Sequence, residues 1–259
     1  MKKLFRSSLL LLLVGVICSF GVTANASEVT TEPERSDDSV VIVIMDGKSI
    51  AISENAMQQV LGKSDGPIRV MVKGKIDEGS IGVDIEALAD GTLVAKVRKS
   101  TLGTAEQPVN IRTKTALPAY AGNSEESTTT RTTPNRYGWA KSWIECPVGI
   151  HNAKVKASMK YYDSGSTVNS GQDALLEASW NEVTWDLVNG PWGYWDPDGP
   201  NIAWINCYGE FDSWFPGNQH HTQMAEFDGL PGGYYYSYHD IDNLPEFHTF
   251  HTDSDLDYI

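Results

Sequence analysis

The stretch AKVKASMKY, residues 153–161, shows most clearly which kind of fold the chain adopts. An apolar side chain stands at every odd position from Ala153 to Tyr161, and a lysine or a serine stands at every even position. Successive side chains of an extended chain point to opposite sides. The pattern therefore predicts a β-strand with one buried face and one face in water, as is common in antiparallel sheets.

Strand-like segments fill the rest of the C-terminal part. Turn sequences rich in Gly, Pro and Asn separate them, and none carries a helical stripe of apolar residues. The segments are ALLEASWNEVTWDL (174–187), NIAWINCYGEFDSWF (201–215), GYYYSYHDI (233–241) and EFHTFHT (246–252). We therefore expect residues 136–259 to form an acidic, tryptophan-rich antiparallel β-sandwich, Ig-like or jelly-roll-like in its architecture.

Residues 37–100 predict a separate, small α+β accessory domain with the element order β-β-α-β-β-β. The run VVIVIM before the turn pair Asp46-Gly47 is a hairpin signal. Ser53 is expected to cap a helix formed by ENAMQQVL (54–61), which the following glycine would end. Acids and bases are mixed over this part and no catalytic constellation appears, so we expect an accessory or partner-contacting role.

Residues 101–135 between these two parts are rich in Thr, Ser and Pro and have no apolar periodicity. Such a composition cannot bury a core, so we interpret the segment as a solvated linker. Its segment VNIRTKT (109–115) can add a strand to the domain before it.

The N-terminus predicts export. A positively charged start precedes an apolar run, and Ala24 and Ala26 form a small-residue cleavage signal, so residues 1–26 are interpreted as a signal peptide. The bulky Ile17 before Cys18 argues against a lipid anchor. We expect a secreted bacterial protein, cut near Ala26 and without a membrane anchor.

The cysteine count agrees with an oxidising compartment. Only Cys146 and Cys207 remain after the leader, and one disulfide between them is the favoured interpretation. Two buried free thiols are the alternative. The two cysteines, with tryptophans between them, resemble the immunoglobulin pattern at the level of architecture, and no family is identified.

Charge is distributed unevenly along the chain. The formal net charge is −14, and from Tyr161 to Ile259 there are 17 Asp and Glu residues and no Lys or Arg. This acidity repels nucleic acid phosphates and anionic lipid, so both are poor partners, and it favours metal cations, basic peptides or neutral sugars. Solubility of a secreted protein is the simpler explanation.

The motif DPDGPN, residues 196–201, raises the possibility of a calcium site. Asp196, Asp198 and Asn201 supply oxygens, but glycine stands fourth where an EF-type loop needs it sixth. The motif therefore indicates a turn that carries carboxylates, and Ca²⁺ is the one cofactor that it suggests. Similar acidic candidates are Asp240, Asp242 and Asn243 in HDIDN, and Asp253, Asp255 and Asp257 in DSDLD.

Histidines gather near the C-terminus, but their spacing does not match a zinc motif. We expect them mainly at surface or core positions. They are His220, His221, His239, His248 and His251.

Aromatic residues give the clearest binding signal. Trp192, Tyr194 and Trp195 stand among glycines and prolines, where a strand interior cannot bury all three. Exposed rings beside carboxylates and amides suit the stacking of a sugar ring. The alternative is a loop that packs against the end of the sandwich.

These features lead to one main functional hypothesis and two alternatives. The main one is a secreted, non-enzymatic binding or interaction protein that recognises carbohydrate or cell-wall glycan. The first alternative is a glycan-cleaving hydrolase, which needs a facing pair of carboxyl groups. No motif selects such a pair among Glu177, Glu182, Glu210 and Glu226. The second is a secreted antagonist or toxin with an N-terminal prosegment.

Overall fold

The computed structural model describes the larger part of the chain: residues 39–100, 113–116, 133–146, 151–180, 184–196, 201–213 and 219–259. Within these ranges the chain forms strands and no helix, and so none that is long and apolar enough to cross a membrane. The expected signal peptide and most of the expected linker lie outside the described residues.

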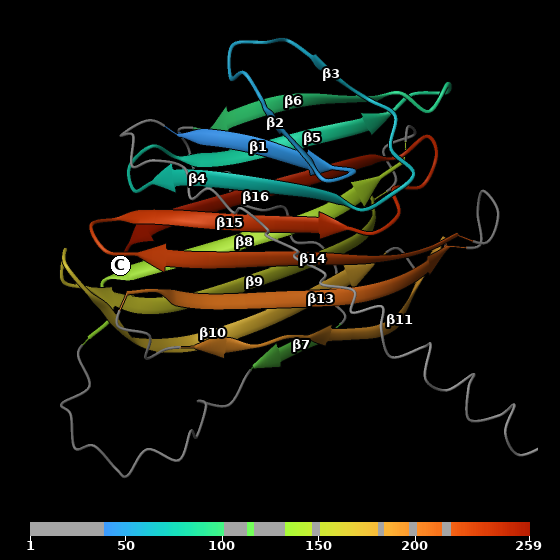
Figure 1. The fold of residues 1–259 in the computed structure, drawn as a ribbon. Coiled ribbons are helices and arrows are strands. Elements are labelled where there is room, and N and C mark those ends of the chain that lie inside the picture. The colour runs from blue at the N-terminus through green and yellow to red at the C-terminus, as the bar shows by residue number, and fades with distance from the viewer. Residues whose placement is uncertain are drawn as a thin grey trace, which may run out of the picture. The chain divides into compact units, whose positions relative to one another are not determined.

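The strands form two antiparallel sheets, so the expected mainly β fold is confirmed (Figure 1). The first, sheet A, has the strand order β11-β13-β14-β15-β4-β1-β2, with β12 also paired to β13. Its strands are β1 (Val40–Met45), β2 (Lys48–Ala51), β4 (Ile68–Lys75), β11 (Trp185–Trp192), β12 (Trp195–Asp196), β13 (Ala203–Ser213), β14 (Gln219–Leu230) and β15 (Tyr234–Ile241).

The second, sheet B, has the strand order β3-β6-β5-β16-β8-β9-β10-β7. Its strands are β3 (Gln59–Gly62), β5 (Ser80–Ala87), β6 (Leu93–Ser100), β7 (Thr113–Ala116), β8 (Arg136–Glu145), β9 (His151–Asp163), β10 (Val168–Trp180) and β16 (Thr249–Tyr258).

The inner faces of the two sheets meet in one apolar core. In sheet B the stretch AKVKASMKY lies in β9, and its odd positions, including Val155 and Tyr161, are buried as the alternation predicts. From sheet A, Ile205 and Phe227 enter the same core. Strand β14 contacts β8 and β9, and β13 also contacts β9. The period of two thus places every second side chain of β13 and β14 on the outer side of sheet A.

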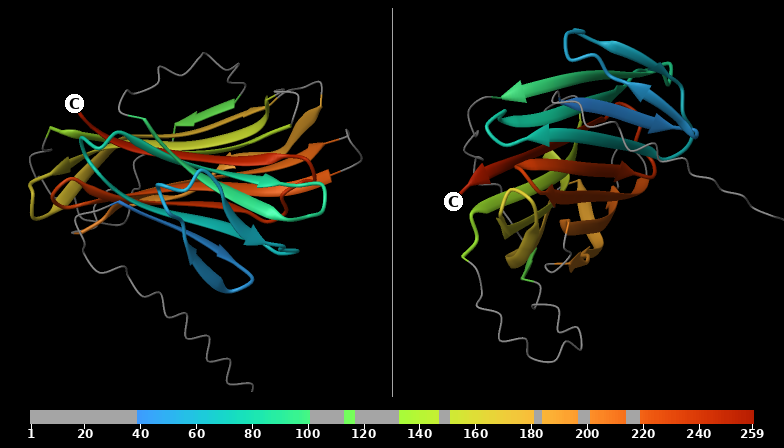
Figure 2. Two further views of the ribbon diagram at one scale, coloured as in Figure 1. Left: turned by 90° about the horizontal axis from the view of Figure 1, so that it is seen from above. Right: turned by 60° about the vertical axis from the view of Figure 1, so that its left-hand side comes forward.

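The expected separate α+β domain is not supported, because its strands belong to both sheets. Strand β4 pairs with β15 from Lys75↔Tyr234 to Ile68↔Ile241. Strand β5 pairs in the same way with β16. In Figures 1 and 2 the red strands β15 and β16 lie between the blue-green strands and the yellow to orange ones. The chain from Asp38 to Ile259 is one compact unit.

The helix expected over residues 54–61 is wrong. Ser53 O accepts a hydrogen bond from Ala56 N in a turn, and Gln59 then starts strand β3 beside β6. Met57 is 89% exposed and Val60 is 70% exposed. A helix here would have no apolar stripe to bury, whereas an extended chain gains backbone hydrogen bonds from the open edge of β6.

The strand expected within VNIRTKT forms, but it joins a different partner. Only its last part is described, as β7, and β7 pairs with β10 from Ala116↔Leu175 to Thr113↔Ala178. Strand β7 therefore extends sheet B next to β10, which comes from the C-terminal part. It does not pair with a strand of residues 37–100.

Candidate functional site

The outer side of sheet A carries a set of aromatic and acidic side chains, which we call the acidic–aromatic face. It is built from three cross-strand rows on β13, β14 and β15. The rows are Trp204↔Asp228↔Tyr236, Asn206↔Glu226↔Tyr238 and Tyr208↔Met224↔Asp240. The intervening residues, such as Ala225 and Phe227, are fully buried in the core. Alternation along the three strands therefore determines which residues make up the face.

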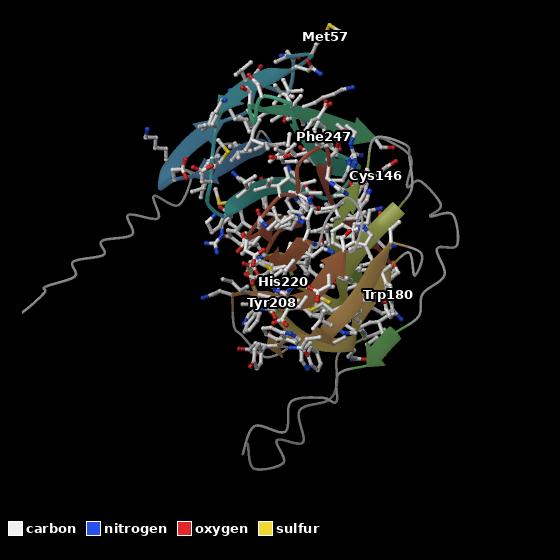
Figure 3. All side chains as sticks on the ribbon, turned by 90° about the vertical axis from the view of Figure 1, so that its right-hand side faces the viewer. Met57, Cys146, Trp180, Tyr208, His220 and Phe247 are labelled. Atoms are coloured by element: carbon white, nitrogen blue, oxygen red, sulfur yellow. The ribbon has the colours of Figure 1, made fainter. Side chains whose placement is uncertain are left out.

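Two aromatic rings stack at the β13 side of this face. The rings of Trp192 and Tyr208 are nearly parallel, with centroids 4.3 Å apart and an interplanar angle of 9°. Trp192 is 37% exposed and the neighbouring Tyr194 is 65% exposed. Figure 3 shows Tyr208 on sheet A. Trp192, Tyr194 and Tyr208 together form an accessible aromatic platform.

Trp195, which the sequence placed with this platform, is buried. Its exposed fraction is 9%, and it pairs with Ile205 in the short strand β12. The preceding Gly193 runs against β13 so closely that a Cβ there would lie 2.0 Å from Asn206 O. The chain therefore returns to the sheet at Trp195, whose ring packs into the core and is not accessible to a ligand.

Asn206 joins the platform to the acidic residues. Its Oδ1 accepts a hydrogen bond from Tyr194 N at 2.8 Å, and its own backbone N donates to Tyr194 O at 2.9 Å. The same side chain donates from Nδ2 to Glu226 Oε2 at 3.3 Å. One buried amide thus fixes the loop that carries Tyr194 and also orients a carboxylate on the next strand.

Two carboxyl groups of the face have raised pKa values. Burial raises the pKa of Asp228 to about 8, with a further contribution from the charge of Glu226. Burial also raises the pKa of Glu226, although its hydrogen bond to Asn206 opposes the shift. Asp228 Oδ1 is buried and has no hydrogen-bond partner among the described residues. Asp228 is therefore protonated at neutral pH, which is uncommon for an aspartate.

The β4 side of the face ends in an ion pair. Arg69 Nε and Nη2 donate to the two carboxylate oxygens of Asp240 at 2.8 and 2.7 Å. Asp240 was a candidate cation ligand, and this two-pronged contact with a guanidinium already occupies both of its oxygens.

The calcium expectation at DPDGPN stays a prediction. Asp196 is half-buried in β12 and Asn201 is exposed, but Asp198 lies outside the described residues. Within the described ranges no three His, Cys, Asp or Glu side chains come together as a metal site. In DSDLD, Asp253 and Asp255 are buried, and Asp253 pairs with Lys141 at 3.4 Å.

The histidines occupy core and surface positions outside the three rows of the acidic–aromatic face. His221 and His239 are fully buried, and burial lowers the pKa of each to about 3. His248 is also buried. His251 stacks on Trp143 on sheet B, and His220, labelled in Figure 3, pairs with Asp212 at the surface.

The expected disulfide is not seen, because Cys146 and Cys207 are not joined to each other. Cys207 Sγ contacts Glu177 O at 3.7 Å. In the register of sheet B, Glu177 on β10 lies opposite Lys156 on β9, which lies opposite Lys141 on β8. Cys146 is five residues further along the chain than Lys141. Five residues of extended chain span about 16 Å, whereas disulfide-bonded Cα atoms lie within about 7 Å. Burial instead raises the pKa of the Cys207 thiol to about 12.

Comparison with known proteins adds little to this description. No protein-family model matches the chain, and no curated protein matches it. Its structure is similar to the hypothetical protein lmo2686 from Listeria monocytogenes EGD-e over 60% of this chain and 95% of that one, with 10% identity and a TM-score of 0.24. So slight a similarity carries no argument about function.

Only part of the platform and of the acidic–aromatic face is recognisable in the sequence. The glycine-rich setting of Trp192 and Tyr194 indicated both rings, whereas Glu226 was one of four available glutamates that no motif distinguished. Asn206 and Tyr208 lie within a strand-like segment and carry no binding signal of their own. Alternation within AWINCY places Asn206 and Tyr208 on the side opposite the buried Cys207. This pattern identifies both as outward-facing once Cys207 is known to face the core.

Proposed function

We propose that the protein is secreted and binds carbohydrate, such as a cell-wall glycan, on the acidic–aromatic face of sheet A. The observation that carries this proposal is the accessible stack of Trp192 on Tyr208 beside the exposed Tyr194. Flat, partly exposed rings offer apolar surface to the C–H face of a sugar, and they lose little conformational freedom when a ligand binds.

Polar groups next to the platform support a sugar ligand over a purely apolar one. Next to the platform, Glu226 presents a carboxylate that accepts hydrogen bonds from hydroxyl groups. The acidity of the C-terminal part, with 17 Asp and Glu and no Lys or Arg from residue 161 onward, disfavours polyanionic ligands. A neutral polyhydroxylated ligand satisfies both conditions.

The expected export signal and the finer architecture belong to the same proposal. Residues 1–26 have the composition of a signal peptide, which would bring the protein to extracellular glycans. A jelly-roll-like sandwich is the architecture that we propose for the two packed sheets, since one outer sheet face then forms a broad, rigid surface for an extended ligand.

A binding measurement with three single variants tests the proposal. Trp192→Ala and Tyr194→Ala should each weaken binding of a recognised oligosaccharide about 5- to 10-fold, because each removes a stacking surface worth about 1 kcal/mol. Val188→Ala, at an exposed apolar position of β11 outside the platform, is the matched control and should bind as the unaltered protein does. Isothermal titration of the mature chain against oligosaccharides gives these constants. Equal affinity for all three variants would place the binding surface elsewhere.

A further inference from the structure

Glu226 and Asp228 form a carboxyl pair beside the aromatic platform. They stand two residues apart on β14, with Phe227 between them in the sequence. Phe227 is buried in the core, so Glu226 and Asp228 share the outer side of sheet A. Two residues of extended strand separate their Cβ atoms by about 6.7 Å. In glycosidases that invert configuration, the carboxyl groups of acid and base lie about 6.5–9.5 Å apart, which leaves room for a water molecule, and two side chains that extend in parallel from Cβ atoms at this spacing keep a separation in that range.

The surroundings of the pair are mainly aromatic. On β13 the cross-strand neighbours are Trp204 beside Asp228 and Asn206 beside Glu226. On β15 they are Tyr236 and Tyr238. Burial disfavours the charged form of both carboxyl groups, and in such surroundings the electrostatic effect of each group on a bound ligand is stronger than in open solvent.

We infer that the protein also cleaves the glycan that it binds, with Asp228 as general acid, Glu226 as general base and inversion of configuration at the anomeric carbon. This inference rests on the proposed binding function, because the bound sugar must lie between the platform and β14. Asn206 links the platform to the carboxyl pair, because it hydrogen-bonds both to the backbone of Tyr194 and to the carboxylate of Glu226.

The reaction is a hydrolysis and needs only water as its second substrate. Asp228 gives its proton to the glycosidic oxygen while the bond from that oxygen to C1 breaks, and the leaving sugar departs as an alcohol. Glu226 takes a proton from a water molecule, whose oxygen forms the new bond to C1 from the opposite side. Transfer of the proton from Glu226 to Asp228 through solvent then restores the starting state.

The two environments assign these roles. Asp228, with its pKa raised to about 8 by burial and by the charge of Glu226, holds a proton at neutral pH. Glu226 accepts a hydrogen bond from Asn206, which favours the ionised form that a base requires. Burial also raises the pKa of Glu226, so the role of base rests on the hydrogen bond from Asn206, a kind of contact that Asp228 Oδ1 lacks among the described residues. The hydrolysis rate should therefore fall as the pH rises through about 8.

The test measures binding and cleavage on the same ligands. The mature chain is incubated with hexasaccharides of β-1,4-linked glucose, xylose, mannose or N-acetylglucosamine in water enriched in ¹⁸O. Isothermal titration reports binding, mass spectrometry reports shortening and ¹⁸O uptake, and proton NMR reports the first anomer formed. We expect a bound hexasaccharide to be shortened, to gain ¹⁸O at the new reducing end and to release the inverted α-anomer first.

Variants separate the catalytic pair from the binding platform. Asp228→Asn and Glu226→Gln should each lower the hydrolysis rate about 10²- to 10⁴-fold and change the dissociation constant less than about threefold. Trp192→Ala should instead weaken binding. Glu210→Gln, on the outer side of β13, removes a carboxylate outside the pair and should leave the rate unchanged.

Each outcome decides between the two proposals. A hexasaccharide that is bound but remains intact from pH 5 to 9 overturns the hydrolysis and leaves the binding function standing. So does undiminished cleavage by the Asp228 and Glu226 variants. The absence of binding to every hexasaccharide counts against the binding function itself. If a variant fails to fold, as circular dichroism would reveal, the first anomer from the unaltered protein still decides, because the retained β-anomer excludes this mechanism.

Discussion

At the scale of single residues, Asp228 is held where its ionised form is disfavoured. Its Oδ1 is buried and has no hydrogen-bond partner among the described residues, while Glu226 stands nearby on the same strand. A carboxyl group in such a position lowers the stability of the fold whenever it ionises. Groups of this kind are common at functional sites, where stability is exchanged for chemistry.

Asp228→Asn should remove a pH dependence of stability. Below pH about 4 the Asp228 carboxyl is protonated in both the folded and the unfolded chain, and between about 4 and 8 only the folded chain keeps the proton. Stability is therefore lost as the pH rises through this window. At pH 9 the variant should be more stable by about 1–3 kcal/mol, while at pH 4 the two proteins should melt alike. Thermal melts at both pH values measure this, and parallel curves would show that Asp228 ionises freely.

At the scale of elements, Asp163 connects a turn of sheet B to a turn of sheet A through hydrogen bonds. Asp163 is the last residue of β9. Its carboxylate accepts hydrogen bonds from Gly165 N at 2.7 Å, Gly232 N at 3.2 Å and Gly233 N at 2.9 Å. Gly232 and Gly233 have φ values of +81° and +76°, a backbone region that glycine adopts without strain. Arg136 Nη2 adds an ion pair at 3.3 Å. The turn between β9 and β10 is thereby joined to the turn between β14 and β15.

Asp163→Asn should lower the free energy of unfolding by about 3 kcal/mol. The variant keeps the size of the side chain but loses the charge and one acceptor, so the partly buried Arg136 and the backbone N–H groups lose part of their pairing. Asp173→Asn is the control, because the pair of Asp173 with Lys160 is exposed to solvent and should contribute little to the free energy of unfolding. Denaturant titrations give both values. A loss below 1 kcal/mol for Asp163→Asn would mean that the two turns hold without this carboxylate.

At the scale of the whole molecule, the two halves of the chain share both sheets. Strands β15 and β16 come from the C-terminal part and pair with β4 and β5 from the N-terminal part. Neither half alone can provide hydrogen-bond partners for the backbone groups along the edges of these strands. Separation of the halves would also expose core residues such as Val70 and Ile85 to water.

A cut between the halves should therefore leave them together. A specific protease site inserted between residues 117 and 132 would produce two pieces that co-elute in gel filtration and melt in one transition. The N-terminal piece expressed alone should be unfolded, as circular dichroism can show. Two pieces that separate under native conditions, each with its own cooperative melt, would instead restore the two independent domains that the sequence suggested.

The sequence by itself determined the features that depend on neighbouring residues. Alternation from Ala153 to Tyr161 gave the strand and its buried side, and the glycine-rich setting of Trp192 and Tyr194 indicated accessible rings. Both are local properties, because side-chain direction in an extended chain has a period of two whatever the strand pairs with. The helix over residues 54–61 failed because local preference is weak against an available sheet edge.

Only the tertiary structure decided which segments meet. It paired β4 with β15, separated Cys146 from Cys207, buried Trp195 and placed Asn206 between Tyr194 and Glu226. Strand pairing depends on contacts between residues far apart in the chain, and a short alternating strand fits several partners equally well. The candidate site lies across three such pairings, so its residues are recognisable in the sequence one by one, while their arrangement follows from the order of the strands in sheet A.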